Sequence, residues 1–136
     1  MTGLSPQQRG AARSRLAAER ERTTARLAAL QRDLESIIAS TASAAGADDE
    51  HDPEGSSTAF DRQHVAALLA SAKDQLAAID RAGHRLDDGS YGRSVRSGVP
   101  IPDERLEADP AAELTVEEAR QAERDAEHEQ ARDVGH

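Results

Sequence analysis

The sequence predicts an all-α-dominated fold built on a long antiparallel coiled-coil helical hairpin, and two observations lead to it. Large apolar side chains are scarce, since 27 of the 136 residues are Ala while Leu, Ile, Val and Phe together number 21. That share, about 15%, lies below the roughly 20% under which a compact globular core becomes doubtful. One Phe, one Tyr and no Trp further disfavour a sandwich, barrel or doubly wound sheet. The second observation is a pair of long segments with coiled-coil spacing.

The first of these segments predicts a helix from about Ser5 to Thr41. After Pro6 it contains no further Pro and a single Gly, Gly10. Its seam repeats mostly every three or four residues, at Leu16, Thr23, Leu27, Leu30, Leu34, Ile37 and Thr41. This spacing is that of a heptad seam, and the Arg, Glu and Ala on the other faces are good helix formers.

Small and acidic residues interrupt the pattern at 42–57, where two Gly and one Pro predict a loop. The alternation then resumes through about Asp87. Its seam positions are Val65, Leu69, Ala72, Leu76, Ile79, Gly83 and Leu86. Because each seam is too narrow to be buried alone, we expect the two arms to pair antiparallel. Residues 1–87 would then form a helical hairpin with an acidic tip at about 42–57.

The remaining third of the chain predicts a small lobe at 88–118 and a C-terminal helix with a frayed tail at 119–136. A turn signal follows Asp87, and Pro100 and Pro102 exclude helix at their positions. Thr115 is a candidate helix N-cap, because Thr-Val-Glu-Glu resembles a capping box. The later turns, to about Arg132, carry few large apolar residues and are expected to fray.

Charge and composition exclude several classes of function. The 26 acidic residues against 17 Lys and Arg disfavour direct DNA binding, and a basic protein surface is the expected partner. The absence of Cys excludes disulfides and thiolate metal sites. No apolar run approaches the ~20 residues that span a bilayer, and the N-terminus lacks the apolar core of a secretion signal. We therefore expect a cytoplasmic monomer without membrane contact.

The acidic tip is the densest cluster of potential metal-binding side chains in the sequence. Around His51 it contains Asp48, Asp49, Glu50, Asp52 and Glu54. Such oxygen ligands suit Mg²⁺, or act on a metal site of a partner, although Asp, Pro and Gly are also ordinary loop residues. The five His residues show no paired-ligand spacing, and neither a phosphate-binding loop nor a nucleophile elbow is present. The chain is not expected to be an enzyme, and no catalytic residue is assigned.

A further motif lies at 91–102, which reads Tyr-Gly-Arg-Ser-Val-Arg-Ser-Gly-Val-Pro-Ile-Pro and is followed by Arg-Leu-Glu-Ala at 105–108. It closely resembles the zinc-finger region of the DksA/TraR family, YGxCxxCGxPIPxxRLEAxP, which ends in a second CxxC. The resemblance extends upstream to about Asp48. Aligned on these landmarks, the four cysteines of the family fall at Ser94, Ser97, Thr115 and Glu118. The resemblance thus implies a degenerate zinc-finger-like lobe that has lost all four ligands.

The resemblance also implies a function. DksA/TraR proteins insert a coiled-coil hairpin into the secondary channel of RNA polymerase, where an acidic tip approaches the catalytic magnesium and alters initiation. Better-known members carry Asp-x-x-Asp-x-Ala at the tip, and this chain has Asp49, Asp52 and, in place of Ala, Glu54. Some members act together with ppGpp, a candidate co-effector here. The alternative is a structural or adaptor hairpin for another protein, with metal or nucleotide chemistry at the tip a further option.

No zinc is expected, because Ser and Thr hydroxyls do not readily lose their protons at neutral pH. The lobe must then be held by apolar packing, for which the candidates are Tyr91, Val95, Val99, Ile101, Leu106, Leu114 and Val116. A member without thiolates would keep its shape under zinc starvation or oxidant, which suggests a role in stress response.

Overall fold

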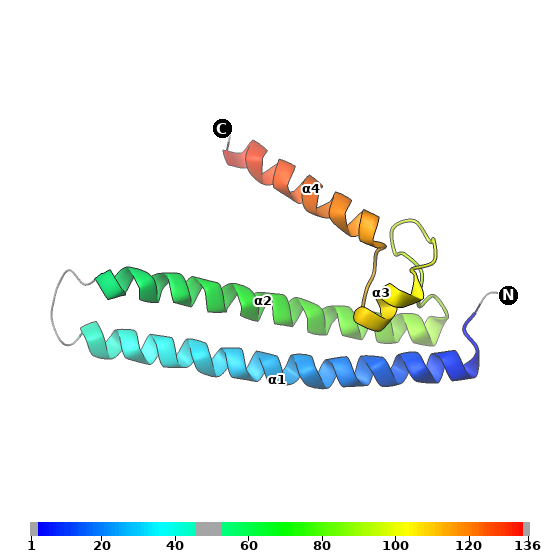
Figure 1. Cartoon of the computed structure of the whole chain (residues 1–136), viewed down its shortest axis with the longest axis horizontal. Helices are drawn as coiled ribbons and strands as arrows, with labels where there is room; N and C mark the ends of the chain where they lie inside the picture. Colours follow the sequence, from blue (N-terminus) through cyan, green and yellow to red (C-terminus); the bar gives the residue numbers. More distant parts are fainter. Residues whose placement is uncertain (1–2, 46–52, 135–136) are drawn as a thin grey trace. The chain divides into compact units, whose positions relative to one another are not determined.

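The computed structural model describes residues 3–45 and 53–134, and these form helices without strands. The helices are α1 (Pro6–Ala45), α2 (Pro53–Asp88), α3 (Asp103–Ala108) and α4 (Val116–Val134) (Figure 1). Within the described ranges, β pairing is limited to one isolated antiparallel bridge between Arg93 and Pro100. The all-α prediction is confirmed. The chain divides into a first unit, Met1–Ala17 with Ala78–His136, and a second unit, Ala18–Ala77.

The second unit consists of α1 and α2 segments that lie side by side in antiparallel directions (Figure 1). Its core contains Leu30, Leu69 and Ala72, with Leu27, Leu34, Val65 and Leu68 packed against them. The heptad prediction is accurate at residue level, since all fourteen predicted seam positions in the two helices are buried or half-buried. Leu, Val and Ala alternating at intervals of three and four therefore provide the apolar contact between the arms.

The interruption between the arms is shorter than the loop expected at 42–57. Helix α1 continues to Ala45, and α2 already begins at Pro53. Proline suits the first position of a helix, because its fixed φ is helical and the missing N–H would lack a helical partner there. The tip residues Asp49 and Asp52 lie outside the described residues. Glu54 lies in the first turn of α2.

The first unit combines the first turns of α1, the last turns of α2, the lobe and α4. Its buried apolar residues come from all of these segments except α4, and they are Ala12, Leu16, Ile79, Ala82, Leu86, Tyr91, Ile101, Leu106, Ala111 and Ala112. Helix α1 begins with a reciprocal capping pair: Ser5 Oγ accepts from the Gln8 N–H at 3.1 Å, and Gln8 Oε1 accepts from the Ser5 N–H at 2.9 Å.

A turn at Asp88–Ser90 ends α2, as predicted. The Asp88 carboxylate accepts hydrogen bonds from the Ser90 N–H at 3.0 Å and from its hydroxyl at 2.6 Å. These bonds lower the pKa of Asp88. Gly92 follows with φ of 91°, in the left-handed region that glycine adopts without strain. An added Cβ there would meet Leu106 Cδ1 at 3.8 Å, so the turn brings the backbone close to α3.

The apolar residues that hold the lobe differ in part from those expected. Ile101, Leu106 and Tyr91 are buried, but Val95 is 57% exposed, Val99 47% and Val116 41%. The 93–99 loop is closed by its own backbone, through hydrogen bonds from Ser94 N–H to Val99 O at 2.8 Å and from Gly98 N–H to Ser94 O at 2.9 Å. Its two valines are therefore left outside the core, and Ala111 and Ala112 are buried instead.

Helix α4 continues to Val134, past the turns that were expected to fray. From Glu123 to Arg132 every residue is exposed. Local pairs stabilise these turns, since Gln121 bonds Asp125 at 2.9 Å and Arg124 at 2.7 Å. Among the described helices, none is both long and apolar enough to cross a membrane.

Candidate functional site

The four residues at the expected cysteine positions are hydrogen-bonded in two pairs, Ser94 with Ser97 and Thr115 with Glu118. Thr115 and Glu118 form the predicted capping box at the start of α4: Glu118 Oε1 accepts from the Thr115 N–H at 3.0 Å, and Thr115 Oγ1 accepts from the Glu118 N–H at 3.2 Å. The loop that carries Ser94 and Ser97 is joined to the segment before α4 by the backbone, since the Val95 N–H donates to the Glu113 carbonyl oxygen at 2.9 Å. The four residues Ser94, Ser97, Thr115 and Glu118 are named below the Glu118 cluster.

The two serine oxygens in turn accept backbone donors of their own loop. Ser94, which is 4% exposed, accepts from the N–H groups of Arg96 and Ser97, each at 3.1 Å. Ser97 Oγ accepts from the Val99 N–H at 3.4 Å. Hydrogen bonds from Ser97, from the Thr115 N–H and from Ser94 hold the pKa of Glu118 at about 2, below its ordinary value of 4.5.

This group does not fit a zinc ion. Zinc in structural sites is bound by thiolates and imidazoles in tetrahedral geometry, and three of these four residues offer only hydroxyls. The hydroxyl oxygens of Ser94, Ser97 and Thr115 already accept from backbone N–H groups. Elsewhere in 3–45 and 53–134, no group of three or more His, Cys, Asp or Glu could hold a metal ion.

The lobe is attached to α2 through Glu113, which sequence reasoning missed. Arg81 donates from Nε to Glu113 Oε2 at 2.8 Å and from Nη2 to Oε1 at 2.9 Å, and Arg85 Nη1 adds a third bond at 3.0 Å. The Arg81 bonds are the main cause that lowers the pKa of Glu113. Arg81 and Glu113 are 32 positions apart in the chain, so no local sequence pattern indicates that they are in contact.

Two further bonds fix the segment between α3 and α4. The Tyr91 hydroxyl donates to the carbonyl oxygen of Pro110 at 2.7 Å, in a buried position. Arg105 Nε donates to the carbonyl oxygen of Leu114 at 2.6 Å. Burial raises the pKa of Tyr91 above its ordinary value of 10.0. The lobe is thus held by one buried and one partly buried hydrogen bond as well as by apolar contacts.

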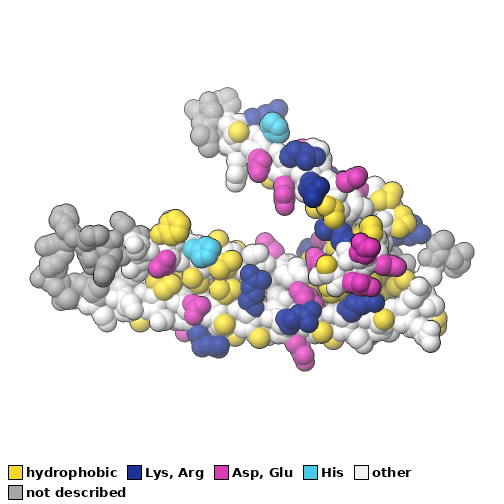
Figure 2. Space-filling model, viewed as in Figure 1, with side chains coloured by type: hydrophobic (Ala, Val, Ile, Leu, Met, Phe, Trp, Pro, Cys, Tyr) yellow, Lys and Arg dark blue, Asp and Glu magenta, His cyan; other side chains and the backbone are white. Residues whose placement is uncertain are grey.

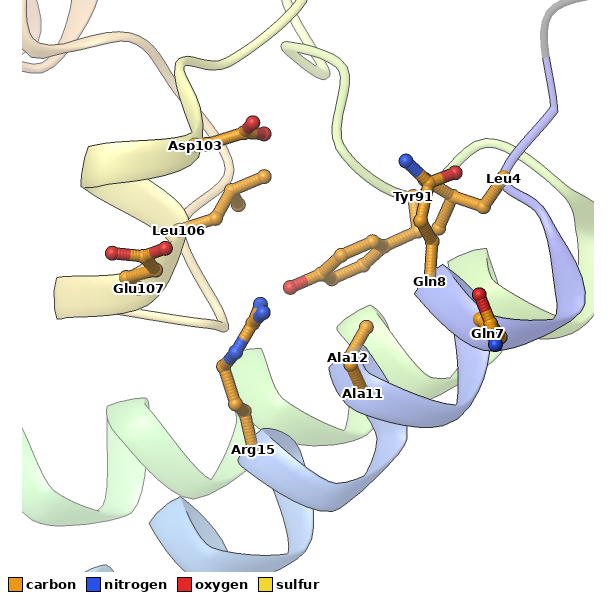
Figure 3. A pocket seen from close by; sticks show the side chains of 10 residues that line it. All are labelled: Leu4, Gln7, Gln8, Ala11, Ala12, Arg15, Tyr91, Asp103, Leu106 and Glu107. Atoms are coloured by element: carbon orange, nitrogen blue, oxygen red, sulfur yellow. The ribbon is translucent and has the colours of Figure 1, made fainter.

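A cavity of about 320 Å³ lies between the first turns of α1 and α3. Figure 3 shows the ring of Tyr91 between these two helices, with Arg15 on the α1 side and Glu107 on the α3 side. Its other lining residues are Leu4, Gln7, Gln8, Ala11, Ala12, Asp103 and Leu106. The lining combines the cation Arg15 with the carboxylates Asp103 and Glu107 and with several apolar side chains. This mixture indicates no single class of ligand.

Three valines and two arginines are exposed in or near the 93–99 loop of the lobe. The half-exposed Val95, Val99 and Val116 are all close to the Glu118 cluster in sequence. Segment 89–102 contains two arginines, Arg93 and Arg96, and no acidic residue, in a chain whose net charge is −9. Figure 2 shows apolar side chains gathered where the loop meets the start of α4. We name these five residues the valine–arginine surface.

In the second unit, two large apolar side chains remain exposed. Phe60 on α2 is 72% exposed and Ile38 on α1 is 47% exposed. Ile38 precedes the segment 46–52 in the sequence, and Phe60 follows it. The expected tip residues Asp49 and Asp52 belong to that segment and lie outside the described part of the chain. The structure therefore adds no geometry for the tip carboxylates.

Comparisons with known proteins find a similar stress protein and a similar transcription factor. The chain is 32% identical over 96 residues to general stress protein 16O of Bacillus subtilis, a match that spans 63% of this chain and 59% of that protein. It is similar in structure to the transcription factor DksA2 from Pseudomonas aeruginosa, with a TM-score of 0.66, 28% identity, and coverage of 90% of this chain and 88% of DksA2. No protein-family model matches. The chain therefore has the DksA/TraR fold, in a form that contains no cysteine.

Proposed function

We propose that this protein is a transcription regulator of the DksA/TraR type, which binds RNA polymerase through the secondary channel and modulates initiation without structural zinc. The observation that carries this proposal is the likeness to the transcription factor DksA2 over 90% of the chain. The paired arms of α1 and α2 supply the hairpin that such insertion requires. The match to a general stress protein supports a role under stress.

The tip carboxylates carry the regulatory step in this proposal. Asp49 and Asp52 occupy both acidic positions of the family's tip motif, and Glu54 replaces its alanine. Three carboxylates near a catalytic magnesium would alter the local field and compete for its coordination positions, because Mg²⁺ prefers oxygen ligands. The additional charge of Glu54 distinguishes this tip from those of the better-known members.

The lobe acts as the docking module. The valine–arginine surface offers exposed apolar area next to two cations, a composition suited to an acidic protein surface with apolar patches. Because Val95 and Val99 are about half exposed, charged substitutions there leave the core unchanged. The double variant Val95→Asp/Val99→Asp should weaken binding to core polymerase while the helical circular dichroism stays that of the wild type.

The decisive experiment is initiation by purified RNA polymerase on a ribosomal promoter, with titrated wild-type protein and Asp49→Asn/Asp52→Asn. A dose-dependent change that this variant loses, while it still binds polymerase, supports action through the tip. Asp61→Asn/Asp74→Asn is the matched control, since it removes two exposed charges from the described part of α2. A Glu54→Ala variant tests the third tip position, and repetition with ppGpp tests the co-effector.

Two outcomes would count against the proposal. If saturating protein neither alters initiation nor binds core polymerase, the adaptor hairpin becomes the better interpretation. If the control variant loses the effect as fully as the tip variant, the response follows overall charge and not the tip.

A further inference from the structure

We propose that Ser94 is a positioning residue for docking: its buried hydroxyl holds the 93–99 loop in one conformation, so that the valine–arginine surface meets its partner already formed. The closed loop is a property of this chain alone, whereas its use in docking rests on the proposed function. The inference depends on the hydrogen bonds within the loop and on the burial of Ser94, which is 4% exposed.

The hydroxyl of Ser94 closes the turn at 94–97 by accepting two backbone donors. Its oxygen accepts from the N–H groups of Arg96 and Ser97, each at 3.1 Å. A hydroxyl oxygen has two acceptor lone pairs, so it can receive both donors together, and serine stabilises turns in this way. An alanine at position 94 would deprive both partly buried N–H groups of this acceptor.

The backbone of the same residue closes the rest of the loop. The Ser94 N–H donates to the Val99 carbonyl oxygen at 2.8 Å, and the Ser94 carbonyl oxygen accepts from the Gly98 N–H at 2.9 Å. Gly98 has φ of 79°, in the left-handed region that glycine adopts without strain. Arg93 Nη1 also donates to the Gly98 carbonyl oxygen, at 3.1 Å. Side chain and backbone of Ser94 together therefore join both ends of the loop.

The closed loop is also fixed to the rest of the lobe. The Val95 N–H donates to the carbonyl oxygen of Glu113 at 2.9 Å. The side chain of Glu113 is held in turn by Arg81 and Arg85 at the end of α2. The loop therefore has a defined place on the lobe, and its exposed side chains are oriented as a set.

A loop that is already closed binds with less loss of conformational entropy than one that must be ordered by its partner. Four of the five residues of the valine–arginine surface belong to the loop, namely Arg93, Val95, Arg96 and Val99. The partner that they fit is an acidic protein surface with apolar patches. Opening the turn at 94–97 should therefore weaken docking without changing any of the side chains that make contact.

Hydrogen exchange in the free protein tests the loop itself. In Ser94→Ala, exchange at the amides of Arg96 and Ser97 should accelerate roughly tenfold, while the amide of the buried Leu106 keeps its rate. Ser94→Thr retains the hydroxyl and should retain the slow rates. Ser97→Ala is the matched control, because the Ser97 oxygen accepts the longer bond from Val99, at 3.4 Å. Unchanged rates in Ser94→Ala, or equal acceleration at Leu106, would overturn the proposal.

A glycine pair opens the loop by another route and leaves the hydroxyl in place. Gly98→Ala strains the loop at φ of 79°, and Gly89→Ala applies the same kind of strain outside it, at φ of 86°. In both, an added Cβ has nothing within 4 Å, so the two substitutions differ in their place alone.

These variants are then compared in initiation by purified RNA polymerase. Ser94→Ala and Gly98→Ala should each raise the concentration for a half-maximal effect roughly fivefold, whereas the maximal effect, which depends on the tip, and the response to Gly89→Ala stay as in the wild type. If the loop opens and the half-maximal concentration does not change, the role of Ser94 in docking is wrong. If the wild type itself binds no polymerase, the proposed function fails, and the docking role fails with it.

Discussion

The guanidinium of Arg81 donates two parallel hydrogen bonds to the carboxylate of Glu113, at 2.8 and 2.9 Å, and so joins α2 to the segment that precedes α4. Such a fork fixes orientation as well as distance. Arg85, whose side chain is 13% exposed, adds a third bond to the same carboxylate. Glu113 is therefore the shared acceptor that fastens the lobe to the base of the hairpin.

The first prediction concerns this pair. Arg81→Lys keeps the positive charge but loses the two parallel hydrogen bonds to Glu113. Because the Arg81 side chain is 54% exposed, this variant should lower the free energy of unfolding by only about 0.5–1 kcal/mol. Glu113→Gln also weakens the bond to the partly buried Arg85, and should cost about 1–2 kcal/mol. Chemical unfolding followed by tyrosine fluorescence measures both, since Tyr91 is the single Tyr and no Trp is present. Equal losses in the two variants would contradict this ranking.

The second prediction concerns the ionisation of Tyr91. Burial raises the pKa of its phenol above 10.0, so the folded state disfavours the phenolate. The free energy that this contributes is fully present below the unfolded value and is lost as the pH rises beyond it. Titration of phenolate absorbance should show a midpoint above that of the urea-unfolded chain. A midpoint equal to that of the unfolded chain would mean that the ring and its bond to Pro110 are solvated.

A matched pair of glycine substitutions should have opposite effects. Gly83 lies inside α2 with nothing within 4 Å of an added Cβ, so Gly83→Ala should stabilise the protein by up to about 1 kcal/mol. Gly92 has φ of 91°, and Gly92→Ala should destabilise it by about 1–2 kcal/mol because L-residues are strained there. Thermal unfolding of both variants provides the test. The same sign for both would be inconsistent with the backbone described here.

The fourth prediction is that metal and redox conditions leave the fold unchanged. The lobe is held by Glu113, by Tyr91 and by the capping box of Thr115 and Glu118, and the chain has no thiol to oxidise. Melting temperatures should therefore be equal with and without a zinc chelator, and with and without peroxide. A relative with four intact cysteines is the positive control, which should lose stability in both treatments. A fall in melting temperature of this protein with chelator would disprove metal independence.

The hairpin could be predicted from the sequence because its determinants are periodic. Leu30, Leu69 and Ala72 were placed in the seams by spacing alone, and each is buried. The loop was predicted too long, because Gly, Ser and Pro weaken a helix without forbidding it, and Pro53 suits a helix start. The tip prediction for Asp49 and Asp52 remains a prediction.

The lobe could be predicted only in part. Thr115 was recognised as an N-cap because the capping box is a local pattern. The valines at 95 and 99 were expected inside from their apolar character alone, yet they are exposed, since a loop closed by its own hydrogen bonds does not alternate regularly. The bond between Arg81 and Glu113 depends on tertiary placement and has no signature in the sequence.

The last prediction is the acid dependence of the Glu118 cluster. The folded pKa of Glu118, about 2, is depressed below its ordinary 4.5, so its stabilisation is complete above the unfolded value and disappears as the pH falls between the two. The difference in unfolding free energy between wild type and Glu118→Gln should thus be greatest at neutral pH and approach zero near the folded pKa. Asp88 and Glu113, whose pKa values are also lowered, titrate in both proteins and cancel in the difference. A difference that does not vary with pH would mean that the ionised carboxylate contributes nothing beyond the shape of its side chain.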